Sequence, residues 1–234
     1  MISFILPAYN EEAMVGAAVD SIQAAARDCG QPFEIIVVND ASADRTAEIA
    51  HAHGARVIDV HKRQIAAVRN AGAREAEGDI FVFLDADSIL PPEVLRAALD
   101  ALADGAIGGG AFVDFDFRPG FFQRVFVRVF TFFYFQVARW AAGCFIFVKR
   151  DAFQAINGFD ERYFASEEIH LSRALKRQGR FVLLKAPVIT SGRKLKRYSP
   201  LGMAGIFLRL GIQGRAGVQK REGLELWYDG KREQ

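Results

Sequence analysis

Two carboxylates separated by one residue follow a strongly apolar segment of this 234-residue chain. Asp85 and Asp87 come directly after residues 80–84, whose sequence IFVFL is apolar at every position. That pattern is typical of a parallel strand covered on both faces, and open α/β sheets bind ligands beyond the carboxyl ends of such strands. Carboxylate oxygens at this spacing suit Mg²⁺ or Mn²⁺, which also accept phosphate oxygens. The competing interpretation is that Asp87 or Ser88 caps a helix that begins near Pro91.

Polar side chains also follow two earlier apolar segments. Residues 2–6 lead into PAYNEE at residues 7–12, and residues 33–38 lead into NDAS at residues 39–42. Because the carboxyl ends of parallel strands lie along one edge of a sheet, we expect the side chains of all three strand ends to converge there. The absence of a Gly-rich loop after the first strand disfavours a dinucleotide-binding site and a nucleotidyltransferase.

Strands and helices alternate through the first half of the chain. The predicted strands span residues 2–6, 33–38, 56–60 and 80–84, and the predicted helices span residues 11–26, 44–53, 64–76 and 92–102. This alternation predicts an α/β fold in which helices flank both faces of a mostly parallel sheet.

The second half of the chain is less regular. Residues 111–117 have the alternating pattern of a half-exposed strand, and residues 144–148 form another apolar run. The three glycines at residues 108–110 open the first of these strands, and we expect them to form a bend there. A helix is predicted over residues 166–178, with Ser166 as its N-cap, two glutamates in its first turn and Gly179 after its last residue.

The composition of the chain is that of one folded domain. Hydrophobic residues make up 51% of the sequence, and the net charge of +2 argues against general nucleic-acid binding. Cys29 and Cys144 lack the spacing of a metal or redox site, which fits a reducing compartment. Residues 1–7 are typical of a strand rather than a signal peptide, and the chain has no segment of about eighteen uncharged apolar residues. We therefore expect a cytoplasmic location.

Together, several motifs of this chain resemble those of glycosyltransferase family 2. The matching motifs are, in order, PAYNEE, NDAS, Asp44 with Thr46, AVRNAG at residues 67–72, Asp85 with Asp87, and GFDE at residues 158–161. The resemblance covers roughly residues 2–190 and implies the nucleotide-diphospho-sugar transferase fold called GT-A. It implies a domain over residues 1–192, with a nucleotide-binding half to about residue 105 and an acceptor-binding half from about residue 106. Residues 193–234 would form a basic loop and a helical appendage.

The resemblance implies an enzyme that uses Mg²⁺ or Mn²⁺ to transfer a sugar from a UDP- or GDP-sugar to an acceptor hydroxyl. The residues expected to contact the nucleotide sugar are Pro7, Ala8, Tyr9, Glu11, Asp40, Arg69, Asp85, Arg193 and Lys194. Asp40 would accept a hydrogen bond from the base, unless it is only a turn residue. Arg69 would neutralise phosphate charge, unless it lies on a solvated helix face. Asp87 would hold the metal, with Asp85 near the ribose or a metal-bound water.

The resemblance also identifies a candidate general base. The family commonly carries Glu-Asp at the start of a helix in this region, and this chain has Glu167 and Glu168 there. Glu168 is expected to remove the acceptor proton in an inverting reaction, and the alternative is that both glutamates only favour the helix dipole. His170 is either a third metal ligand, as in a retaining enzyme of the same fold, or a partly buried histidine.

Two segments suggest further partners. Residues 121–140 are rich in phenylalanine and carry several arginines, so they are expected to form core, a homodimer interface or a peripheral membrane contact that meets a lipid-linked acceptor. Residues 193–234 contain ten lysines and arginines against four acidic residues. Arg193 and Lys194 would stabilise the leaving diphosphate or face anionic lipid at the inner side of the membrane. The alternative to an enzyme is a non-catalytic protein that binds a sugar nucleotide or a membrane surface.

Overall fold

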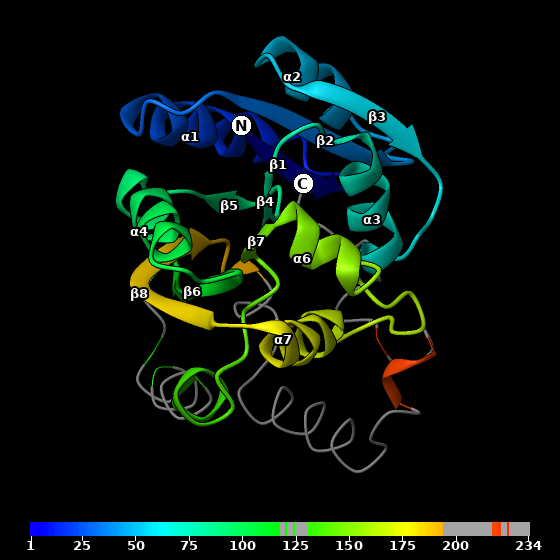
Figure 1. The fold of residues 1–234 in the computed structure, drawn as a ribbon. Helices are drawn as coiled ribbons and strands as arrows, with labels where there is room; N and C mark the ends of the chain where they lie inside the picture. Colours follow the sequence, from blue (N-terminus) through cyan, green and yellow to red (C-terminus); the bar gives the residue numbers. More distant parts are fainter. Residues whose placement is uncertain (118–119, 121–123, 125–130, 194–216, 221–223, 225–234) are drawn as a thin grey trace.

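A single mixed sheet organises the part of the chain that the structure describes. The computed structural model describes residues 1–117, 120, 124, 131–193, 217–220 and 224. Within this part, eight strands are hydrogen-bonded in the order β3-β2-β1-β4-β7-β6-β8-β5. Helices pack on both faces of the sheet (Figure 1), so the predicted α/β fold is confirmed.

The first half of the chain builds the parallel part of the sheet. Its strands are β1 (Ile2–Ala8), β2 (Phe33–Asp40), β3 (Arg56–Val60) and β4 (Ile80–Leu84), and its helices are α1 (Val15–Asp28), α2 (Thr46–Ala52), α3 (Ile65–Glu75) and α4 (Pro92–Ala103). Strand β1 lies between β2 and β4 and is parallel to both. The carboxyl ends of these strands therefore lie along one edge, as the strand–helix alternation predicts.

The second half extends the sheet with strands of mixed direction. Its strands are β5 (Ser88–Ile89), β6 (Gly108–Phe115), β7 (Phe145–Lys149) and β8 (Phe181–Thr190), and its helices are the π-helix η1 (Phe132–Val137), α6 (Arg150–Ala155) and α7 (Glu167–Gln178). Strand β7 is antiparallel to both β4 and β6, whereas β8 is parallel to β6. Because β7 lies between β4 and β6, the second half of the chain places α7 near the end of β4.

Two apolar layers cover the faces of the sheet. The period-two alternation of a strand sends Phe4 and Leu6 of β1 to the layer that includes α1 and α4. Ile5 between them points to the layer that includes α3, α6 and α7. Charged side chains are thus excluded from both faces of β1 and are displayed where the strand ends.

The three glycines of residues 108–110 open a strand, as predicted, but they are paired on both sides as regular strand residues and do not form a bend. They form the first residues of β6, between β7 and β8. A Cβ atom at Gly109 would lie 2.6 Å from the ring of Phe147 and would also meet the carbonyl oxygen of Val182. Glycine is required here because the neighbouring strand and its aromatic ring approach the backbone closely.

The beginning of α7 differs in detail from the prediction. Ser166 occupies the N-cap position, but its backbone is left-handed, with φ 64°, and its side chain forms no capping hydrogen bond. Its carbonyl oxygen accepts a hydrogen bond from the N–H of Ile169 at 3.1 Å. The helix is therefore capped less completely than a serine in the usual extended conformation would allow.

Only parts of the two segments with proposed partners lie within the described residues. Residues 121–123 and 125–130, and most of residues 193–234, lie outside them. Of the rest, Phe135 is buried and stacks on Phe112 with ring centroids 4.9 Å apart. Val218 and Leu224 pack with Tyr163. None of the described helices has the length and apolar character needed to cross a membrane.

Candidate active site

Asp85 and Asp87 lie in a tight turn where β4 ends. The N–H of Asp85 donates to the carbonyl oxygen of Cys144 at 3.2 Å, and the N–H of Ser88 donates to the carbonyl oxygen of Asp85 at 3.0 Å. The side chains of Asp85 and Asp87 are 30% and 19% exposed. Neither Asp87 nor Ser88 caps α4, because Pro91 holds the N-cap position. The two carboxylates are thus held at the open edge of the sheet and are accessible to a ligand.

Arg69 of α3 joins this turn to the start of α7. Its side chain is 1% exposed, and its guanidinium group donates to Asp85 Oδ1 at 2.9 Å, to Glu167 Oε1 at 2.7 Å and to the carbonyl oxygen of Gly143 at 2.7 Å. The interpretation of Arg69 as part of a solvated helix face is therefore wrong. Its charge is directed at two carboxylates, and it fixes α7 beside the Asp85–Asp87 turn.

The buried ion pair predicts a large effect on stability. Arg69→Met should lower the free energy of unfolding by about 3 kcal/mol, because it leaves the carboxylate of Glu167 buried without its cation. Urea unfolding at neutral pH measures this loss. The matched control is Arg56→Met, since Arg56 is 44% exposed and its pair with Glu34 is worth less than about 1 kcal/mol. Equal losses in the two variants would contradict the role given to Arg69.

Glu168 follows at the N-terminus of α7 and has a different environment from Glu167. Its Oε1 lies 3.0 Å from the hydroxyl of Tyr134, which is also 3.0 Å from the carbonyl oxygen of Ala141. Burial, together with the neighbouring charge of Glu167, raises the pKa of Glu168 to about 8. Burial and the charge of Glu168 likewise raise the pKa of Tyr134 well above its ordinary value, so its hydroxyl stays protonated. The Glu168 carboxyl group is therefore able to exchange a proton near neutral pH.

Arg193 reaches across the site to two acidic side chains. Its guanidinium group donates to Glu11 Oε2 at 2.7 Å and to Asp87 Oδ2 at 3.0 Å. Glu11 is buried at the end of the segment that follows β1. The structure thus brings the ends of β1 and β4 together with Arg193, the third residue after β8, as the convergence of strand ends predicts. Lys194, the other expected cation of this loop, lies outside the described residues.

The ends of β2 and β3 form the neighbouring part of the rim. The carboxylate of Asp40 accepts hydrogen bonds from the N–H groups of Lys62 at 2.6 Å and Arg63 at 2.8 Å. The guanidinium group of Arg63 lies 4.2 Å from the centre of the Tyr9 ring. Asp40 is therefore a support for the loop after β3, as the turn interpretation expects, and its contact with a base stays a prediction. Pro7 and Ala8 are the last residues of β1, directly before Tyr9.

Asp44 and Thr46 have a structural role that the motif alone did not reveal. Asp44 accepts hydrogen bonds from the N–H groups of Glu12 and Thr46, at 3.1 and 3.0 Å. Thr46 in turn accepts a hydrogen bond from the N–H of Glu11 at 2.7 Å. These contacts fasten the loop after β1 to the loop after β2. The preference of aspartate and threonine for local backbone hydrogen bonds was the available sequence signal.

His170 packs against an aromatic ring. It lies in the first turn of α7, and its ring stacks on Tyr163 with centroids 3.6 Å apart and an angle of 11° between the planes. No group of three or more His, Cys, Asp or Glu side chains arranged as metal ligands occurs among the described residues. This arrangement offers no support for His170 as a third ligand beside Asp85 and Asp87, and that alternative stays a prediction.

The Asp85–Asp87 turn fits one kind of metal ion. Mg²⁺ and Mn²⁺ prefer oxygen ligands, and Mg²⁺ is commonly held by one or two carboxylates plus water and substrate phosphates. Two partly exposed carboxylates at the edge of the sheet meet that requirement. They would not by themselves satisfy a site built entirely from protein ligands. The donor set therefore fits a divalent ion that binds together with a diphosphate.

Curated proteins with similar sequences include bacterial transferases. The undecaprenyl-phosphate 4-deoxy-4-formamido-L-arabinose transferase of Pseudomonas paraeruginosa is 34% identical over 113 residues, which cover 45% of this chain and 33% of the relative. The enzyme of the same name from Pectobacterium carotovorum is 35% identical over 114 residues, covering 44% of this chain and 34% of the relative. The matched region thus spans about a third of the length of these relatives.

Solved structures with the same architecture include three complexes with nucleotides. S. aureus TarS with UDP-GlcNAc has a TM-score of 0.64 at 20% identity and covers 81% of this chain and 58% of that chain. Mannosyltransferase PcManGT from Pyrobaculum calidifontis with GDP-Man and Mn²⁺ has a TM-score of 0.66 at 22% identity, covering 89% and 60%. Glucosyl-3-phosphoglycerate synthase from Mycobacterium tuberculosis with Mn²⁺, UDP-glucose and phosphoglyceric acid has a TM-score of 0.63 at 22% identity, covering 93% and 80%. At these identities the comparison shows the fold alone.

Family membership is established by a sequence match over more than half of the chain. The family model described as glycosyl transferase family 2 matches residues 3–156. This range contains β2 to β7 and all but the first residue of β1, and it includes the Asp85–Asp87 turn. The chain therefore belongs to glycosyl transferase family 2 and has the GT-A fold.

Proposed function

We propose that this protein transfers a sugar from a nucleoside-diphosphate sugar to the hydroxyl group of a lipid-linked acceptor, in a reaction that depends on Mg²⁺ or Mn²⁺. The observation that carries the proposal is the bridge formed by buried Arg69 between Asp85 and Glu167. It holds a pair of ligand-accessible carboxylates next to a glutamate that can take a proton. The lipid-linked acceptor is suggested by the undecaprenyl-phosphate transferases among the relatives.

Different residues at the edge of the sheet would contact the base and the diphosphate of the donor. Tyr9, whose ring contacts the guanidinium group of Arg63, would contact the base, and the Asp40 carboxylate, still an acceptor, lies at the end of the adjacent strand. Asp87, with Asp85, would hold the divalent ion, which when bound would neutralise the charge of the departing diphosphate. Arg193 already lies against Asp87 and is positioned to add a second positive charge there.

Glu168 is the proposed general base of an inverting transfer. Its carboxylate would remove the proton of the acceptor hydroxyl, and its pKa of about 8 is high enough to hold that proton. The hydroxyl of Tyr134 fixes the carboxylate and favours its charged form, because a hydrogen bond from Tyr134 lowers the pKa of Glu168. The ion pair between Arg69 and Glu167 holds the N-terminus of α7, and so Glu168, in place.

Tyr134→Phe tests the proposed environment of the base. The variant should lose about tenfold in transfer rate at about pH 7, because a hydrogen bond to a charged group is worth roughly 1.5 kcal/mol. The profile of rate against pH should move to higher pH, because the pKa of Glu168 rises when the hydrogen bond is lost. Above about pH 10, where the carboxylate is charged in both proteins, the rates should converge. A loss of equal size at every pH would contradict this role.

The transfer reaction itself is tested by a screen of donors. Thermal denaturation with a panel of UDP- and GDP-sugars, each with and without Mn²⁺, should identify a donor that raises the melting temperature only when the metal is present. That donor is then assayed with polyprenyl-linked acceptors, and NMR of the product distinguishes inversion from retention. Stabilisation by a nucleotide sugar without transfer or hydrolysis would favour the non-catalytic alternative.

A phosphate acceptor is the second candidate, and one observation favours it. The relatives are named for undecaprenyl phosphate, and a phosphate monoester is largely ionised at about pH 7. It would need no base, and a carboxyl group that is mostly protonated at that pH would not repel it. Polyprenyl phosphate and a polyprenyl-linked sugar, assayed side by side, separate the two candidates.

A further inference from the structure

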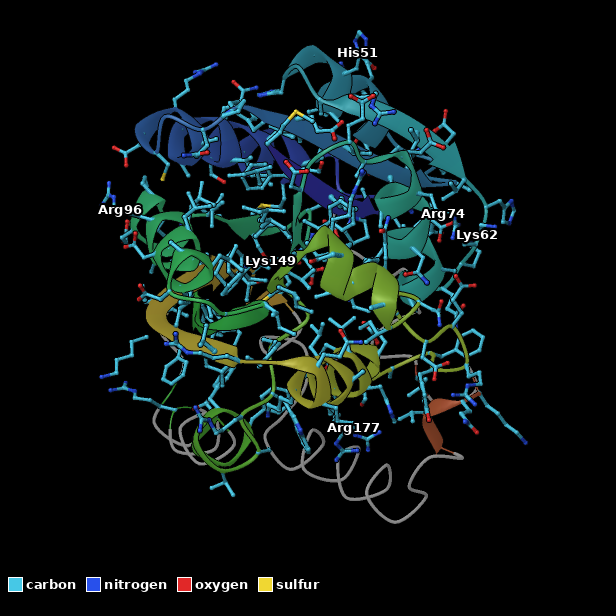
Figure 2. The ribbon with its side chains drawn as sticks, in the orientation of Figure 1. His51, Lys62, Arg74, Arg96, Lys149 and Arg177 are labelled. Carbon is cyan, nitrogen blue, oxygen red and sulfur yellow. The ribbon has the colours of Figure 1, made fainter. Side chains whose placement is uncertain are left out.

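One outer face of α7 carries a cluster of cations. Arg173, Lys176 and Arg177 are spaced three and four residues apart, so they lie on one side of the helix. All three side chains are exposed, and Figure 2 shows Arg177 on the outer side of α7, away from the sheet. The exposed Arg139 follows the C-terminal end of η1. We call these four cations, with Val137 and Trp140, the α7 basic face.

The parts of this face are in direct contact with one another. Lys176 donates to the carbonyl oxygen of Ala138 at 3.1 Å, and the guanidinium group of Arg173 lies 4.9 Å from the centre of the Trp140 ring. Partial burial, followed by the charges of Arg139 and Arg173, lowers the pKa of Lys176 below its ordinary value. Like charges thus lie close enough to repel one another.

The cations of the α7 basic face lack acidic partners within the described chain. None of the ion pairs found among the residues 1–117, 131–193 and 217–220 includes Arg139, Arg173, Lys176 or Arg177. By contrast, Arg69 and Arg193 each bind two carboxylates at the active site. A concentrated positive charge of this kind attracts an external anionic surface.

Apolar side chains lie among these cations. Val137 is 62% exposed and is one of three exposed large hydrophobic side chains in the part of the chain that the structure describes. Trp140, three residues further along the chain, is partly exposed. Tryptophan and snorkelling lysine or arginine side chains are typical of surfaces that enter the headgroup region of a bilayer. A polyanion such as RNA would make use of the charges but not of an exposed valine.

We propose that the α7 basic face docks the protein onto a bilayer that contains anionic lipids. The cations would contact lipid phosphates, while Val137 and Trp140 would enter the headgroup region. Docking is independent of the donor and of the proposed reaction. Glu168 is nine residues from Arg177 on the same helix, so the two positions are about 13 Å apart along its axis.

Vesicle binding by the full chain, without any nucleotide sugar, tests the proposal. The protein should sediment with vesicles of phosphatidylcholine containing about 30 mol % phosphatidylglycerol at about 0.1 M salt, and not with pure phosphatidylcholine. The double variant Arg139→Gln with Arg177→Gln should bind about 25-fold more weakly, since each cation near the surface contributes about fivefold. Equal binding of the two vesicle types would overturn the proposal.

A matched control removes the same charge elsewhere. Arg74→Gln with Arg96→Gln alters two exposed arginines of α3 and α4, which Figure 2 shows far from Arg177. This control should bind like the wild type, and equal weakening in both double variants would overturn the proposal, because net charge alone would then explain binding. Wild-type binding by the Arg139/Arg177 variant would also overturn the proposal.

Tryptophan fluorescence locates the contact. The chain has two tryptophans, so Trp227→Phe leaves Trp140 as the single reporter. Brominated lipids quench a tryptophan only when it enters the bilayer, and Trp140 should be quenched in anionic vesicles and not in neutral ones. Binding without quenching of Trp140 would place the contact on another surface and overturn the proposal. An inactive protein that passes both tests would contradict the proposed function and leave the docking face intact.

Discussion

Asp87→Ala should abolish metal-stimulated sugar transfer, with a loss of about 10⁴-fold that corresponds to roughly 5 kcal/mol. Asp87 and Asp85 are the accessible carboxylates of the turn after β4, and in the proposed function they would hold a divalent ion shared with the diphosphate. Losing one of two protein ligands removes the charge that would offset the leaving diphosphate. The rate is measured with the donor found by thermal shift, with and without Mn²⁺.

The same substitution also removes a partner of Arg193, so a second variant is needed. Arg193→Gln loses the contacts with Glu11 and Asp87 but keeps both carboxylates of the turn. It should retain Mn²⁺ binding in the presence of UDP, measured by electron paramagnetic resonance, whereas Asp87→Ala should lose it. Asp100→Ala, a change at an exposed position of α4, controls for the loss of one negative charge. Full activity of Asp87→Ala would refute the assigned metal site.

The first half of the fold is predictable from local patterns. The bounds of β3 and β4 agree with the predicted strands at residues 56–60 and 80–84. Fully buried strands leave continuous apolar runs, and crossover helices leave periodic ones. The position of β7 was not predictable in this way. It pairs antiparallel with β4, more than sixty residues earlier, and no local pattern specifies a partner at that distance.

The candidate site shows the same division between local and long-range information. The placement of Asp85 and Asp87 follows from the end of one strand. The role of Arg69 does not, because Glu167 lies 98 residues away along the chain and the ion pair exists only once α3 and α7 meet. Tyr134 was missed for a related reason. A tyrosine within a phenylalanine-rich segment suggests that one hydroxyl needs a polar partner, but the sequence did not identify Glu168 as that partner.

Glu168→Gln should lower the turnover number by about 10² to 10⁴-fold and leave donor affinity nearly unchanged. Glutamine preserves the size of the side chain and its hydrogen bond with Tyr134, but it cannot take the acceptor proton. The wild-type rate should rise with pH up to the pKa of Glu168, about 8, and then level off. The residual rate of the variant should not follow this profile. An unchanged rate with a hydroxyl acceptor would remove Glu168 as the base, whereas an unchanged rate with polyprenyl phosphate alone would favour the phosphate acceptor.

The stability of the same variant separates a lost base from a damaged structure. The pKa of Glu168 is raised in the folded protein from about 4.5 to about 8, so between these values the folded protein retains a proton that the unfolded chain has released. The contribution of Glu168 to stability therefore falls as the pH rises through this window. Glutamine has no charge to bury, so the free energy of unfolding of Glu168→Gln relative to the wild type should increase from about pH 5 to about pH 8. A variant that is slower yet no less stable at the higher pH has lost the chemistry of the carboxylate, because a disrupted α7 would lower both the rate and the stability.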